Sequence, residues 1–106
     1  MESNESRPDP LLERIRTAPA MLAYFSTPRC TVCTVLRPKV EALLADYPEV
    51  EFLYVDATAH PEVSGQHLVF AAPTIALFMD GREMRRYSRN LAMDDLDRAL
   101  ALMTAR

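Results

Sequence analysis

Cys30 and Cys33 are the only two cysteines in the chain, and both lie in the segment PRCTVC at residues 28–33. Two thiols at this spacing have three ordinary uses: a dithiol that exchanges with other disulfides, a pair of metal ligands, or two small core residues. If they lie on one helical turn, the spacing of three brings the sulfurs close enough to form a small disulfide ring. Which use applies depends on the secondary structure that holds the two cysteines.

A buried strand followed by a helix is expected to hold the two cysteines. The segment MLAYF at 21–25 is an apolar run of strand formers, and it leads into the turn-like STPRC. Apolar residues then recur at helical spacing until Tyr47, before Pro48; they are Val32, Val35, Leu36, Val40, Leu43 and Leu44. Cys30 would begin this helix, where free N–H groups and the helix dipole favour a thiolate. Cys30 is therefore the predicted nucleophile, and Cys33 the resolving thiol.

The two other uses stay open at this point. A zinc site needs about four ligands, and the further soft candidates are His60 and His67, whose spacing of seven is not that of a zinc finger. Each histidine also has a simpler interpretation as a surface or capping residue. Because cysteine is among the most buried residue types, a purely structural pair is the other alternative.

The rest of the chain predicts a layered α/β domain. Residues 1–8 are polar and are expected to form a flexible tail, and 9–106 a single domain. Asp9 and Pro10 are typical of a helix start. The expected elements are a helix at 10–17, a strand at 50–57, a helix at 60–68, a strand at 73–79, a turn at Asp80-Gly81, a strand from 82, and a last helix with Leu96, Leu100 and Met103 on one face.

Composition limits the partners and the compartment. The chain has 106 residues, a formal net charge of −3, 49% hydrophobic and 25% charged residues, which suits a soluble globular protein. This charge gives no general affinity for nucleic acid or anionic membranes, and no apolar run is long enough to span a bilayer. MESNESRPDP lacks the features of a secretory signal, so the expected location is cytoplasmic.

A strand, CTVC, a helix containing Pro38, APT before a strand, and a DG hairpin follow one another between about residues 10 and 104. In this order they resemble the thioredoxin family. The resemblance implies a thioredoxin-like α/β fold, with a four-stranded mixed β-sheet and helices on both faces. It also implies a thiol–disulfide oxidoreductase that uses no metal and no cofactor beyond its own dithiol.

The resemblance further implies a substrate site. Pro73 would be a cis proline that faces the dithiol, and the backbone beside it, at Ala72, would pair with a substrate chain. Arg29 and Arg89 are candidates to lie near Cys30, where they would lower its pKa and attract acidic partners. The implied partners are a protein or low-molecular-weight disulfide as substrate, and a reductase or a thiol as electron donor.

The sequence departs from the family at five places. Arg29 replaces a tryptophan, Thr31-Val32 replaces Gly-Pro, and Ser88 or Arg89 replaces a glycine; Tyr24 and Phe52 stand where the family carries a buried acid and a lysine. Without the acid, Cys33 should release product slowly. Without the proline, the redox potential should be less reducing than about −270 mV. A redox-inactive binding module and a thiol sensor are therefore the alternative functions.

Overall fold

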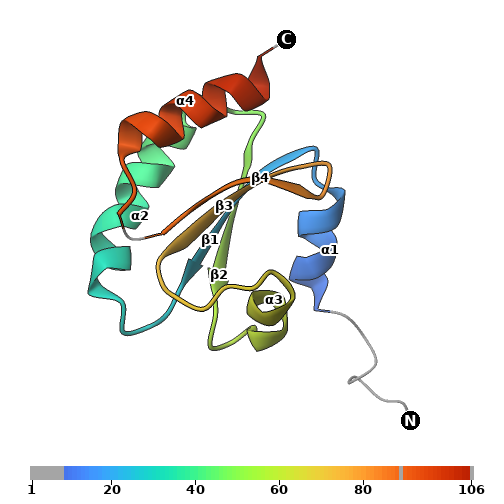
Figure 1. The fold of residues 1–106 in the computed structure, drawn as a ribbon, viewed down its shortest axis with the longest axis vertical. Coiled ribbons are helices and arrows are strands. Elements are labelled where there is room, and N and C mark those ends of the chain that lie inside the picture. The colour runs from blue at the N-terminus through green and yellow to red at the C-terminus, as the bar shows by residue number, and fades with distance from the viewer. Residues whose placement is uncertain (1–8, 89, 106) are drawn as a thin grey trace.

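The computed structural model describes residues 9–88 and 90–105, and a mixed four-stranded sheet forms their centre (Figure 1). The strand order is β2-β1-β3-β4, with the bounds Glu51–Asp56, Ala20–Ser26, Thr74–Met79 and Arg82–Tyr87. β1 and β2 are parallel, while β3 is antiparallel to both β1 and β4. The predicted crossover followed by a hairpin is confirmed.

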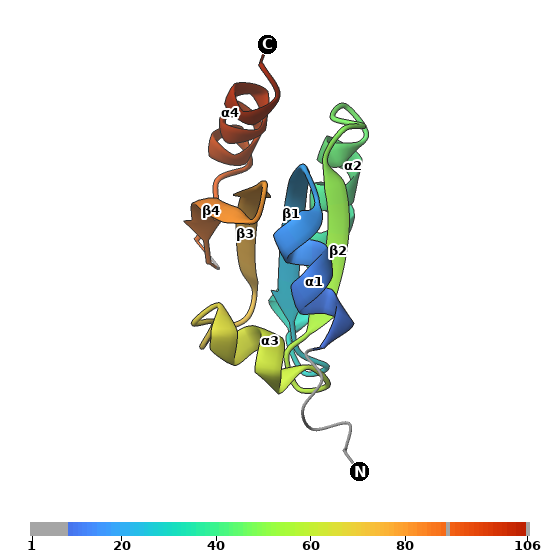
Figure 2. The ribbon, with the colours of Figure 1, turned by 90° about the vertical axis from the view of Figure 1, so that its right-hand side faces the viewer.

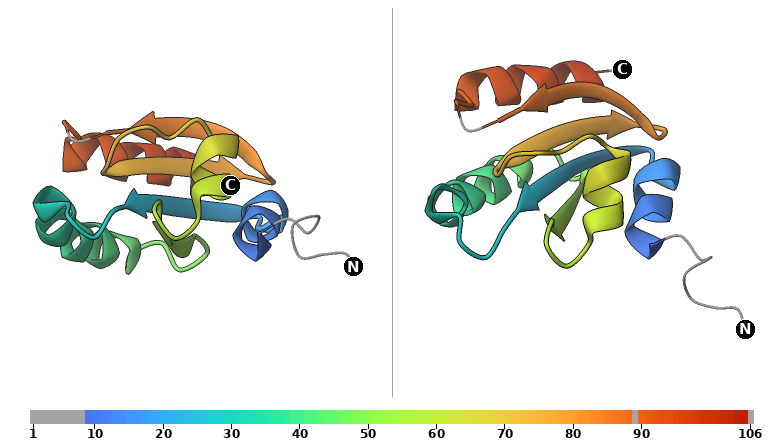
Figure 3. Two further views of the ribbon diagram at one scale, coloured as in Figure 1. Left: turned by 90° about the horizontal axis from the view of Figure 1, so that it is seen from below. Right: turned by 60° about the horizontal axis from the view of Figure 1, so that its bottom comes forward.

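Helices cover both faces of this sheet, as the resemblance implied. Helices α2 (Thr31–Leu44) and α4 (Met93–Thr104) lie on one face, and α1 (Pro10–Thr17) and α3 (Pro61–Gln66) on the other (Figures 1 and 2). The same division is seen in two further views (Figure 3). Within the described residues, no helix combines the length and the apolar composition needed to cross a bilayer.

The central strand β1 is buried along its whole length. Successive side chains of a strand point to opposite faces, so β1 supplies both cores. Leu22 and Tyr24 pack into the cluster under α2 and α4, whereas Met21, Ala23 and Phe25 pack into the cluster under α1 and α3. A run of seven buried residues is therefore required at this position, and the apolar MLAYF provides most of it.

The start of α1 agrees with the sequence. Asp9 is the N-cap, and its carboxylate accepts a hydrogen bond from the N–H of Leu11 at 2.9 Å, with Pro10 in the first turn. The other carboxylate oxygen lies 2.6 Å from Nδ1 of His60, the residue before α3. The hydrogen bond to His60, and next that to Leu11, lowers the pKa of Asp9. His60 thus links two helices and makes no side-chain capping bond of its own. The expected tail, residues 1–8, lies outside the described residues.

Three details differ from the sequence-based expectations. The second helix ends at Leu44 and not near Tyr47. Val32 and Val35 are 41% and 62% exposed, so the buried stripe of this helix is narrower than its apolar pattern. The strand from 82 was predicted from a sequence that alternates, but in β4 no residue is fully buried, because it is an edge strand with a register shift opposite Leu77 and Phe78.

The Asp80-Gly81 hairpin forms as predicted, and its backbone requires glycine. The φ angles are 52° at Asp80 and 85° at Gly81, as in the two-residue turns that match strand twist. A Cβ atom at Gly81 would lie 2.7 Å from the carbonyl oxygen of Arg16, so the turn also packs closely against the end of α1.

Gly81→Ala should lower the free energy of unfolding by about 1–3 kcal/mol, because it combines an unfavourable φ with a backbone clash. Gly65→Ala is the matched control. Gly65 lies inside α3 with open space around its Cβ position, so alanine there should stabilise by up to about 1 kcal/mol. Denaturant titration of both variants checks this prediction, and equal effects of the two substitutions would contradict it.

Candidate redox site

Cys30 and Cys33 form a disulfide at the start of α2, with their Cα atoms 5.2 Å apart. Cys30 is the N-cap residue, and its sulfur accepts a hydrogen bond from the backbone N–H of Cys33 at 3.1 Å. Cys33 is only 4% exposed, while Cys30 is half-buried. The two sulfurs therefore differ in access and in contact with the helix N-terminus.

The loop after β1 determines where Cys30 lies. β1 ends at Ser26, and the N–H of Cys30 donates to the carbonyl of Thr27 at 3.2 Å, which closes a turn before the helix. A free helix N-terminus presents N–H groups and partial positive charge, so a Cys30 thiolate would be favoured there over the thiol. The strand-to-helix turn is thus the element that places this cysteine at the helix N-terminus.

The bond between Ala72 and Pro73 is cis, as the resemblance implied. Pro73 is buried, and the hydroxyl of Thr74 donates to the carbonyl of Ala71 at 2.7 Å across the turn. Ala72 and Cys30 both pack against the core cluster under α2 and α4. The cis-proline turn and the dithiol therefore pack against the same core cluster.

Of the two arginines predicted to lie near Cys30, the structure describes only Arg29. Arg29 is exposed on the loop directly before Cys30. Arg89 lies outside the described residues, so its predicted place near Cys30 stays a prediction. On β4, Arg86 bonds Glu83 and donates to the backbone carbonyls of His67 and Leu68, so it links this strand to the end of α3.

Tyr24, which replaces the family's buried acid, is completely buried beneath the disulfide. Its hydroxyl donates to the carbonyl oxygen of Cys33 at 3.0 Å. Burial, and after it the neighbouring Tyr54, raises the pKa of Tyr24 to about 12. Tyr24 is therefore neutral at physiological pH, and its proton is already directed at the backbone, so it is no substitute for a carboxylate base.

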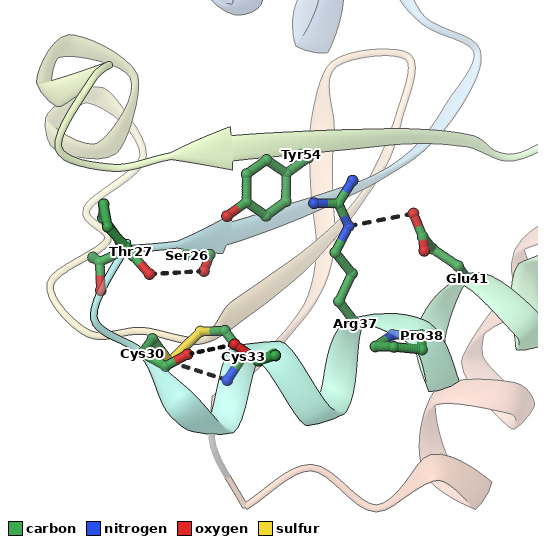
Figure 4. Close-up of a pocket in the computed structure, with 10 residues that line it drawn as sticks. Ser26, Thr27, Cys30, Cys33, Arg37, Pro38, Glu41 and Tyr54 are labelled. Carbon is green, nitrogen blue, oxygen red and sulfur yellow. Dashed lines mark hydrogen bonds and ion pairs between the residues drawn. A yellow bond between two sulfur atoms is a disulfide. The ribbon is translucent and has the colours of Figure 1, made fainter.

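A polar pocket of about 280 Å³ lies beside the disulfide, between α2 and β2 (Figure 4). Its lining includes Cys30, Cys33, Arg37, Glu41 and Tyr54. Of these residues, only the cysteines were predicted from the sequence. A signal for Arg37 and Glu41 was present, since Cys33, Arg37 and Glu41 are spaced by four and lie along one side of the helix.

Metal binding, the second use considered for the cysteines, gains no support from the described residues. Among them no group of three or more histidine, cysteine or acidic side chains could hold a metal ion. The two histidines have other contacts: His60 bonds Asp9, and the ring of His67 meets that of Phe78 edge-on at 5.2 Å.

Known proteins share both the sequence pattern and the fold. The family model Thioredoxin matches residues 7–101. The thioredoxin-like protein YdfQ of Bacillus subtilis is 34% identical over 77 residues, which cover 73% of this chain and 69% of YdfQ. A thioredoxin of Chlamydia trachomatis is 34% identical over 84 residues, 79% of each protein. The X-ray structure of Fasciola hepatica thioredoxin is 29% identical, with a TM-score of 0.75 over 90% of this chain and 89% of that one.

This chain belongs to the thioredoxin family. The family match, the fold and the close Cys30–Cys33 pair together identify it as a thiol–disulfide oxidoreductase. In this chain a neutral Tyr24 lies beneath the dithiol and a polar pocket lies beside it.

Tyr24→Phe should change how stability depends on alkaline pH. The folded protein keeps the Tyr24 proton up to a pKa of about 12, whereas an unfolded tyrosine loses it near pH 10. The folded state then binds more protons than the unfolded state between these values, so the free energy of unfolding falls as pH rises through this window.

The phenylalanine variant lacks this contribution. At about pH 8 it should be less stable than wild type by about 1 kcal/mol, the usual net value of one hydrogen bond. This difference should shrink and then reverse sign as the pH approaches about 12, because raising the Tyr24 pKa from about 10 to about 12 costs wild type alone roughly 2 kcal/mol over this window. Urea unfolding at a series of pH values measures the difference in the free energy of unfolding between wild type and the variant. A difference that stays constant would contradict a raised pKa at Tyr24.

Proposed function

We propose that this thioredoxin-family chain reduces disulfide bonds in proteins, with Cys30 as the nucleophile and Cys33 as the resolving thiol. The observation that carries the proposal is the asymmetry of the pair. Cys30 is the more accessible sulfur and receives the helix N–H of Cys33, whereas Cys33 is buried beneath it. An accessible, stabilised thiolate suits attack, and a shielded thiol suits the second step.

The reaction begins with the reduced dithiol. The Cys30 thiolate attacks one sulfur of the substrate disulfide, and the substrate S–S bond breaks with its electron pair on the leaving sulfur, which takes up a proton. Cys33 then loses its proton to solvent and attacks the Cys30 sulfur of the mixed disulfide. The Cys30–Cys33 bond forms, the second substrate sulfur leaves as a thiolate, and two electrons have passed to the substrate.

The surface near the dithiol favours a protein substrate. Val32, directly before Cys33, and Phe70, just before the cis-proline turn, are 41% and 86% exposed. A small polar disulfide would gain little from these apolar side chains, while a polypeptide segment would cover them. We further propose that the backbone at Ala72 and Pro73 pairs with the substrate chain, with Arg29 and Arg89 attracting acidic residues.

The electrons must be replaced after each turnover. We propose that a reductase or a low-molecular-weight thiol supplies them and that no other cofactor takes part. A cytoplasmic location fits this proposal, since the reducing conditions there keep a dithiol available for attack.

Cys33→Ser should trap the substrate as a mixed disulfide on Cys30, because the second displacement is lost. Cys30→Ser should form no such adduct and should lose disulfide reductase activity. Mass analysis of adducts with a model protein disulfide, such as insulin, checks both outcomes. A redox-inactive binding module would instead keep its partner in both variants, and a thiol sensor would form a redox-dependent complex with little turnover.

The redox potential should be less reducing than about −270 mV, because Thr31-Val32 replaces the family's Gly-Pro between the cysteines. The double variant Thr31→Gly, Val32→Pro is the matched test, and it should shift the potential toward that value. Proline is tolerated here because Val32 lies in the first turn of α2 and is partly exposed. Titration in dithiothreitol buffers, with alkylated cysteines counted by mass, measures both potentials; a wild-type value clearly below −270 mV would refute the prediction.

A further inference from the structure

The polar pocket beside the dithiol connects a buried sulfur to solvent. Cys33 is 4% exposed, whereas the side chains of Arg37 and Glu41 in the same pocket are 41% and 46% exposed. Burial in surroundings of low polarity disfavours a thiolate, and the reaction requires one at Cys33. A positive charge on this pocket wall would offset that cost.

Arg37 supplies such a charge, and three contacts hold its side chain. Its guanidinium carbon lies 4.0 Å from the centre of the Tyr54 ring and 5.6 Å from that of Phe52, which are cation–π distances. Its Nε lies 3.3 Å from the Glu41 carboxylate. In Figure 4 the Arg37 side chain extends from α2 toward Tyr54 and β2, with Glu41 on the side away from the disulfide.

The helix places Arg37 one turn beyond Cys33, and both line the same pocket. Residues four apart on a helix are surface neighbours, so the Arg37 side chain starts one turn beyond Cys33. The charge of Arg37 also reaches the Tyr24 hydroxyl, which donates to the Cys33 carbonyl. Burial, and then Tyr54, raises the pKa of Tyr24. Arg37 lowers this pKa, and Glu41 raises it. Arg37 and Glu41 therefore act with opposite sign on the group directly behind Cys33.

We propose that Arg37 stabilises the Cys33 thiolate in the resolving step, and that Glu41 tunes this effect by pairing with the guanidinium. The proposal rests on the function proposed above and assigns a residue to its second displacement. In that step the Cys33 thiol gives its proton to solvent water through the pocket, and its sulfur attacks Cys30. Arg37 neither binds the substrate nor accepts the proton, so it is a positioning residue that acts through Cys33.

The opposite signs give a sharp test. In a Cys30→Ser background, the ultraviolet absorbance of the Cys33 thiolate is followed as a function of pH. Arg37→Gln should raise the pKa of Cys33 by roughly one unit, while Glu41→Gln should lower it by a smaller amount. Arg37→Lys should stay near wild type, because it keeps the charge. Arg98→Gln removes an ion-paired arginine from α4 and is the control that should leave the titration unchanged.

The kinetic counterpart uses the protein with both cysteines and a preformed mixed disulfide on Cys30. At neutral pH, Arg37→Gln should slow product release by up to about tenfold, the value of one pKa unit, and raising the pH should restore the rate. Higher ionic strength should reduce the difference from wild type, because the pocket is open to solvent.

Two results would overturn the proposal: a Cys33 titration that is the same in Arg37→Gln and wild type, or a Lys variant that behaves like the Gln variant. In either case a wild type that reduces insulin would leave the proposed function standing. A wild type that forms no adduct and reduces no disulfide would instead refute the proposed function itself.

Discussion

The burial of β1 on both faces is the constraint on which the rest of the structure depends. Its alternating side chains supply both core clusters, so neither helix layer can pack unless this strand is in place. Its last residue, Ser26, also fixes where the chain leaves the core and turns into Cys30. The strand that holds the two layers together therefore also positions the nucleophile, and a shift in its register would move Tyr24 away from Cys33.

Near the dithiol, one set of residues fills the core and another carries the charges. A buried carboxylate under Cys33 would need compensation for its lost hydration, whereas the neutral Tyr24 fills the space and satisfies the Cys33 carbonyl. The charges lie instead on Arg37 and Glu41, at the solvent edge of the pocket. This arrangement avoids an unpaired charge in the core, but it makes electrostatic influence on Cys33 weaker and more sensitive to salt.

Much of this fold could be predicted from the sequence, because strong local signals mark the element ends. Asp9-Pro10 begins α1, and Asp80-Gly81 forms the hairpin. Such residues act through their own backbone preferences, which need no knowledge of tertiary contacts. The place of Cys30 at a helix start followed from the turn-like STPRC and from the helical spacing of the apolar residues after it. The cis bond before Pro73 came from the family resemblance alone, since a proline at the start of a strand is equally compatible with a trans bond.

Tertiary packing accounts for what the sequence did not reveal. At about 100° per residue, Val32 lies on one flank of the buried stripe of α2 and Val35 lies nearly opposite the stripe, whereas Arg37 falls on the other flank. An apolar pattern cannot show which flank faces the sheet, because that depends on how the helix lies across β1 and β3. Here the flank with Arg37 faces β2, so a residue typical of a solvated surface meets the rings of Tyr54 and Phe52. The apolar flank is left exposed beside the dithiol. One rotation of the helix thus determines both the charge near Cys33 and the apolar surface available to a substrate.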